Sequence, residues 1–183
     1  PTDINDINAV LLTHEHSDHV HAEHLERLLE VNSDLRIITN VSVRDFIREW
    51  NITAEVIADN GEADIDGVNL KAFESPHAEV HPIITPVLNT SFMIADTLFM
   101  PGDSLKNPGI PVEVLALPVA GPWIKISEAV EYAQAISPKL AFPVHDGGLS
   151  QMGAAHAVPQ KVFAETSTEF KVLNAGDSLT YGE

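Results

Sequence analysis

A dense cluster of histidines directly after a short apolar run constrains this chain more than any other feature. Five of the nine histidines lie between residues 14 and 24. The run at 9–12, Ala-Val-Leu-Leu, is typical of a buried strand, whereas the apolar positions from Val20 to Val31 fall mostly at helical spacing. We therefore expect the cluster on a strand-to-helix loop, with Ser17 or Asp18 capping the helix. So many imidazoles on one turn need a common partner, and a divalent metal ion suits them.

The core of the cluster is the segment 14–19, His-Glu-His-Ser-Asp-His. Its first and third residues alternate off the end of a strand, so their side chains point the same way. Its last two residues, Asp18 and His19, lie past the turn, so their side chains can reach a second position. One loop can therefore serve two metal ions a few ångströms apart.

A single loop cannot complete two coordination shells, so further ligands are expected at other strand ends. Three residues fit this placement because each follows an apolar, β-prone run: His77, Asp103 and His145. A rigid strand that delivers a polar group to a loop is a suitable support for a preorganised site. His81 has two interpretations, a proton donor on the substrate side or a plain loop histidine. His21 and His24 are expected to be exposed helical residues and not ligands.

The remaining pattern predicts an α/β protein with one domain over residues 1–183. A strand at 35–39 precedes a helix that opens with Ser42-x-x-Asp45, in the manner of a capping box. The other expected elements are antiparallel strands at 68–74, 86–95 and 97–100, strands at 114–117, 140–144 and 170–173, and a helix from Ser127 to Ile136. The proline-rich stretch from 101 to 126 is expected to form a loop-rich wall of a site.

Charge and composition narrow the choice of partners. Lys and Arg total 10 against 27 Asp and Glu, and the formal net charge of −17 opposes binding to nucleic acid or to anionic membranes. The absence of cysteine excludes thiolate ligands and a cysteine nucleophile. No apolar run approaches the roughly 18 residues that a transmembrane helix needs, so we expect a cytoplasmic protein.

These motifs resemble the metallo-β-lactamase fold superfamily, whose signature is H-x-H-x-D-H followed by separate His, Asp and His ligands. The resemblance is closest to the branch of small metal-dependent hydrolases that includes ascorbate phosphate lactonase-like proteins. Four segments carry the resemblance. They are the turn Pro-Gly-Asp-Ser at 101–104, the sequence Leu-Pro-Val-Ala-Gly-Pro within 114–123, the segment 138–148 and the ending at 173–178. The segment 138–148 resembles the family pattern Pro-x-His-x-Gly. The resemblance implies an αββα sandwich.

The resemblance also implies a ligand set. By matching position, the first ion is held by His14, His16 and His77, the second by Asp18, His19 and His145, and Asp103 bridges the two. Asp103 and Asp18 are the catalytic candidates. Zinc is the first choice of metal, with manganese or iron as alternatives, because a site of His and Asp accepts all three. Neighbouring polar groups that can orient the imidazoles are Glu15, Ser17 and Asp146.

The implied function is a metal-dependent hydrolase. A metal-bridging hydroxide would attack a small lactone, ester or phosphoester, which we expect to be anionic because the site carries local positive charge. The non-enzymatic alternative is a truncated metal-binding pseudo-enzyme. A flavodiiron oxidoreductase is disfavoured because it would have a carboxylate in place of one loop histidine and would carry a flavin domain. A tRNA-processing nuclease is disfavoured by the acidic charge.

The position of the histidine loop near the start of the chain is a departure from the family pattern. Relatives normally have a longer segment of strands before this loop, so we expect a sandwich that lacks its N-terminal strands. The strand at 8–13 would then be an exposed sheet edge. We expect this edge to pair with another chain, for instance in a homo-oligomer, or the fold to be marginally stable, or both.

Overall fold

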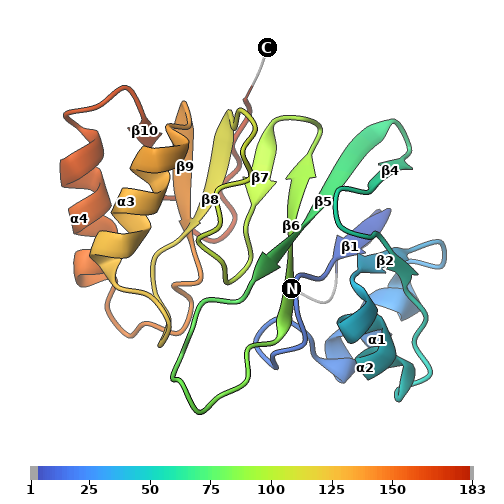
Figure 1. Cartoon of the computed structure of the whole chain (residues 1–183). Coiled ribbons are helices and arrows are strands. Elements are labelled where there is room, and N and C mark those ends of the chain that lie inside the picture. Colours follow the sequence, from blue (N-terminus) through green and yellow to red (C-terminus); the bar gives the residue numbers. More distant parts are fainter. Residues whose placement is uncertain (1–3, 182–183) are drawn as a thin grey trace. The chain divides into compact units, whose positions relative to one another are not determined.

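The computed structural model describes residues 4–181 and divides into two compact units, with the boundary between Pro108 and Gly109. Figure 1 shows the helices and strands of both units along the chain. Within residues 4–181, no helix combines the length and the apolar character needed to cross a membrane. The prediction of a single domain stays a prediction.

The first unit begins with a small parallel sheet in the order β1-β2-β3. Its strands are β1 (Ala9–Leu11), β2 (Arg36–Thr39) and β3 (Glu55–Val56), and they are connected by α1 (Ala22–Val31) and α2 (Val41–Arg48). Parallel strands need such crossovers, so the strand–helix alternation in the sequence correctly indicated an α/β arrangement. β1, which was expected to be an exposed sheet edge, pairs on one side with β2 and forms one end of this sheet.

A core of aliphatic side chains lies between this sheet and its two helices. The buried members are Leu12, Val20, Leu25, Ile37, Val43, Ile47 and Ile52. Val43 and Ile47 stand one helical turn apart on α2, and both are fully buried. This packing fixes the strand end from which the histidine loop departs.

The same unit continues with antiparallel strands, and the sequence predicted all of them except the first, at 62–65. They are β4 (Glu62–Ile65), β5 (Val68–Pro76), β6 (Leu88–Ile94) and β7 (Leu98–Met100), each paired with the next. Two tight turns join neighbouring strands, at Asp66-Gly67 with φ of 51° and 89° and at Ala95-Asp96 with φ of 52° and 51°. The pairing of β5 with β6 runs to Pro76 opposite Leu88, so the residues from His77 onward leave the sheet at its end.

The second unit contains three parallel strands and two helices. The strands β8 (Val114–Pro118), β9 (Leu140–Val144) and β10 (Glu169–Phe170) lie in the order β10-β9-β8. The helices α3 (Ile126–Ile136) and α4 (Gly153–Phe163) lie side by side against these strands (Figure 1). The last strand is two residues long and precedes most of the expected segment at 170–173, while α4 was not expected at all.

Helix starts are the main local correction to the sequence-based expectations. His21, and not Ser17 or Asp18, precedes the first turn of α1, and its side chain makes no capping hydrogen bond. At α2 the cap is Asn40, whose side-chain oxygen accepts a hydrogen bond of 3.0 Å from the backbone N–H of Val43. Ser42 is already within the helix, where its hydroxyl donates to the Glu15 carboxylate at 2.5 Å.

Candidate metal site

The histidine loop begins as a direct continuation of β1. The backbone N–H of Leu12 donates to Ile38 O at 3.0 Å, and the hydroxyl of Thr39 donates to Leu12 O at 2.8 Å. Four residues later the chain turns, because the backbone N–H groups of His19 and Val20 both donate to the carbonyl of His16 at 2.9 Å. The loop therefore has a fixed start and a closed turn.

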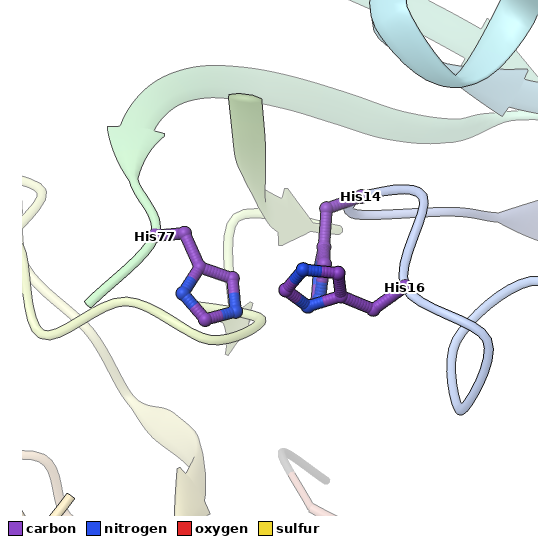
Figure 2. A group of neighbouring side chains, drawn as sticks. All are labelled: His14, His16 and His77. Atoms are coloured by element: carbon purple, nitrogen blue, oxygen red, sulfur yellow. The ribbon is translucent and has the colours of Figure 1, made fainter. Parts of the chain in front are cut away.

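Three imidazoles from two segments converge next to this loop. Figure 2 shows His14 and His16 on one side and His77, which follows β5, facing them. The ring centroid of His77 lies 4.9 Å from that of His14 and 4.7 Å from that of His16, and His14 Nε2 lies 3.1 Å from His16 Nδ1. One nitrogen of each ring lies within 4.8 Å of the others. Ligands about 2.0–2.1 Å from a zinc ion are separated by comparable distances, so the cluster is compact enough to hold an ion.

The Asp103 carboxylate lies beside the histidines and is buried. Its Oδ2 is 3.5 Å from His77 Nε2 and 3.9 Å from His14 Nε2, while its Oδ1 is 3.3 Å from His19 Nε2. The two carboxylate oxygens of Asp103 therefore face different imidazoles. Asp18 lies at the outer edge: its side chain is 62% exposed and its Oδ2 is 3.9 Å from His19 Nε2.

Burial controls the protonation of the cluster. It lowers the pKa of His14 to about 3, and neighbouring His19 adds to this effect. Burial also lowers the pKa of His16. Both rings are therefore neutral at neutral pH, which is the form that binds metal. At His77 burial acts in the same direction, but the Asp103 carboxylate and the Ala78 carbonyl outweigh it and raise the pKa.

A backbone contact sets the tautomer of His77. Its Nδ1 lies 2.7 Å from the carbonyl oxygen of Ala78, so Nδ1 carries the hydrogen and donates it. When the ring is neutral, the lone pair therefore belongs to Nε2, the nitrogen that faces Asp103. A hydrogen bond of this kind from the far side of the ring is typical of metal-binding histidines.

A buried amide holds the turn that carries Asp103. The side chain of Asn89 donates to the carbonyl of Pro101 at 2.9 Å and accepts from the backbone N–H of Asp103 at 3.1 Å. Gly102 lies between them with φ of +62°, and a Cβ at this position would come within 2.3 Å of Asn89 Oδ1 and 2.9 Å of Thr13 Cβ. Only glycine fits this approach without displacing its neighbours.

A second set of buried polar groups holds Thr13, the residue before His14. The carbonyl of Thr13 accepts hydrogen bonds of 2.9 Å from both the Asn40 side chain and the backbone N–H of Thr90. Its hydroxyl lies 3.0 Å from His14 Nδ1 and 3.4 Å from His19 Nδ1. The cluster is thus supported from β6 and from the start of α2 as well as from its own loop.

Sequence reasoning did not identify these supporting residues. The sequence placed Asn89, Thr90 and Ser91 within an apolar strand at 86–95 and indicated no separate role for them. All three are polar residues that are buried in the structure. The available signal was the run of three polar residues inside an otherwise apolar strand. Buried polar side chains normally form hydrogen bonds, so such a run indicates that neighbouring backbone groups or a functional site accept or donate hydrogen bonds there.

His145 belongs to the second unit, where it follows β9. Its backbone has φ of +62°, and its ring is arranged edge-on to Trp123 with centroids 5.7 Å apart. Its role as a ligand stays a prediction. Of the groups expected to orient imidazoles, Asp146 accepts a hydrogen bond from His156 at 2.6 Å, and Ser17 is exposed.

The remaining histidines of the first unit lie at its surface. His21 and His24 are exposed, with ring centroids 4.6 Å apart. His81 is also exposed, and its Nδ1 accepts a hydrogen bond of 3.3 Å from the backbone N–H of Ile83.

A family model described as a β-lactamase superfamily domain matches residues 2–145, a segment that includes every predicted ligand from His14 to His145. The chain belongs to this superfamily. Its relatives include Protein Rv0786c of Mycobacterium tuberculosis, with 33% identity over 97% of this chain and 84% of the relative. The UPF0173 metal-dependent hydrolase MJ1163 of Methanocaldococcus jannaschii shares 25% identity over 76% of this chain and 67% of the relative.

Solved structures share the metallo-β-lactamase type of fold, among them the metallo-β-lactamase fold protein YhfI from Bacillus subtilis, which aligns with a TM-score of 0.66 and 13% identity over 93% of this chain and 76% of that chain. Igni18, described as a novel metallo hydrolase from the hyperthermophilic archaeon Ignicoccus hospitalis, aligns with a TM-score of 0.72 over 96% of this chain and 80% of that chain. The identity is 15%, so this likeness concerns the fold alone. The α/β class and the family predicted from the histidine motif are both confirmed.

Proposed function

We propose that this protein is a metal-dependent hydrolase that acts on a small anionic lactone, ester or phosphoester. The observation that carries the proposal is the convergence of the imidazoles of His14, His16 and His77 beside the buried carboxylate of Asp103. Membership of the β-lactamase superfamily supports it, as does the relative described as a metal-dependent hydrolase.

The donor set fits a divalent cation. Two neutral imidazoles, a third whose Nε2 faces inward and one carboxylate are the ligand types that zinc accepts, and manganese and iron are alternatives. In this proposal His14, His16 and His77 hold the first ion and Asp103 is shared with a second. The resemblance of the sequence to the superfamily assigns Asp18, His19 and His145 to that second ion. The bound ions supply Lewis acidity that activates water and polarises the substrate.

The residues of the chain would then position groups and move protons. Asn89 and the narrow turn at Gly102 hold the backbone of Asp103, which limits the positions that its carboxylate can take. Its Oδ1, 3.3 Å from His19 Nε2, is placed to accept a proton from an incoming water. Asp18 stands at the exposed edge, where it can exchange that proton with solvent.

The ligand chemistry also supports an anionic substrate. Neutral imidazoles do not cancel the charge of bound divalent ions, and Asp103 and Asp18 contribute only two negative charges between them. The site therefore stays locally positive although the whole chain has a formal net charge of −17. Negative charge elsewhere on the chain would favour the release of an anionic product.

Turnover by the metal-loaded protein tests this proposal. The purified chain is saturated with zinc, manganese or iron and assayed against lactones, carboxylic esters, phosphomonoesters and phosphodiesters. We expect hydrolysis of at least one class, a loss of about 100-fold or more in kcat for Asp103→Asn, and no loss for the exposed control Asp45→Asn. Stoichiometric metal without hydrolysis in any class would instead support the metal-binding pseudo-enzyme.

A further inference from the structure

The segment after β9 carries a strained backbone at a predicted metal ligand. His145 has φ of +62°, a left-handed conformation that a residue with a Cβ adopts at a cost. The strand before it is anchored, since the backbone N–H of Val119 donates to Val144 O at 3.1 Å. Beyond it come Gly147 and Gly148, which are exposed and have open space around them. Such a segment needs a separate restraint to stay in one conformation.

One side-chain pair supplies that restraint. His156 Nε2 donates to Asp146 Oδ2 at 2.6 Å, and the two side chains are only 16% and 22% exposed. A short hydrogen bond to a carboxylate away from bulk water is stronger than one between neutral groups. The backbone N–H of Leu149 also donates to the carbonyl of Asp146 at 2.9 Å, so Asp146 organises the turn with both its side chain and its backbone.

The helix that carries His156 is itself well supported. His156 lies in α4, whose residues Ala155, Pro159 and Phe163 are buried. The ring of Phe163 stacks on that of Phe170 in β10 with centroids 5.8 Å apart and an interplanar angle of 28°. The pair therefore connects a turn with two exposed glycines to a helix that is packed against β10.

We propose that His156 and Asp146 are positioning residues that hold the imidazole of His145 in its metal-binding orientation. This inference rests on the proposed function, because it takes His145 as a ligand of the second ion. Without the pair, the turn at 145–149 samples other backbone conformations and His145 leaves its place. The first ion, held by His14, His16 and His77, is unaffected.

Two measurements test the inference. The first is hydrogen exchange of the Leu149 amide in metal-free protein, which we expect to become about 10-fold faster in His156→Ala and in Asp146→Ala. The second is titration with Co²⁺ followed by absorption spectroscopy. We expect the affinity for the second equivalent to fall about 10- to 100-fold in each variant, with no larger loss in the double variant and no change in the first equivalent.

Three further variants make the outcomes distinguishable. His156→Gln retains a donor and is expected to restore much of the affinity, Gln160→Ala on an exposed position of α4 is expected to behave as the wild type, and His145→Ala defines complete loss of the second ion. Unchanged exchange at Leu149 in His156→Ala would overturn the inference whatever the metal data show. So would loss of both equivalents with a lowered Tm in His156→Ala and His156→Gln alike. Retention of the second ion by His145→Ala would instead contradict the ligand set of the proposed function.

Discussion

Two loops in this protein follow the same sequence pattern, an apolar strand that ends in a histidine, but they are held in different ways. The loop after β1 begins at Thr13, whose carbonyl accepts two hydrogen bonds from buried groups. Asp103, which lies beside the histidines of this loop, donates its backbone N–H to the side chain of the buried Asn89. The turn after β9 contains two exposed glycines, and the hydrogen bond between Asp146 and His156 connects it to α4. The support of a candidate ligand therefore comes from partners that are distant in sequence.

The strongest test of this difference is the substitution Gly102→Ala. It combines a left-handed backbone at φ of +62° with a Cβ that would lie 2.3 Å from Asn89 Oδ1. We expect the free energy of unfolding to fall by about 3–5 kcal/mol, the sum of backbone strain and overpacking. Urea unfolding of the metal-free protein measures this loss.

Gly67→Ala is the matched control for that substitution. Gly67 also has a positive φ, +89°, but has open space where the Cβ would stand. It should lose only the strain contribution, about 1–2 kcal/mol. Equal losses at the two positions would show that the close approach at Gly102 contributes nothing.

The next largest effect is expected for Asn89→Ala. This change leaves the carbonyl of Pro101 and the N–H of Asp103 without their buried partner, which costs about 2–4 kcal/mol in unfolding free energy. Asn89→Asp keeps an acceptor for the Asp103 N–H but loses the donor to Pro101, so its loss at neutral pH should be of similar size. An unchanged urea midpoint in Asn89→Ala would contradict the supporting role of this side chain.

The sequence was informative about the candidate ligands and much less so about the residues that support them. The alternation of apolar runs and polar ends located His14, His77 and Asp103 at strand ends, because strand periodicity is a local property. The role of Asn89 could not be read this way, since it depends on a turn twelve residues later in the chain. Helix α4 was missed because Gly153 and Pro159 disfavour a helix locally, while burial of Pro159 and Phe163 supports one in the fold.

Gly148→Ala gives the smallest expected effect and probes the turn after β9. Its Cβ would meet no heavy atom within 4 Å, and no positive φ requires glycine there. We expect the free energy of unfolding to fall by no more than about 0.5 kcal/mol and to rise by at most about 1 kcal/mol. A rise is expected where alanine reduces the conformational freedom of the unfolded chain. A loss above about 2 kcal/mol would show that this turn is packed as tightly as the one at Gly102.

Metal content tests the central claim most directly. Wild type, His16→Ala and His24→Ala are saturated with zinc, separated from free metal by gel filtration and analysed by plasma mass spectrometry; His24 is an exposed histidine of α1 and serves as the matched control. The account predicts that wild type and His24→Ala retain the same metal and that His16→Ala retains at least one equivalent less. Equal metal in all three proteins, or none in the wild type, would contradict the assignment of His14, His16, His77 and Asp103 as a metal site.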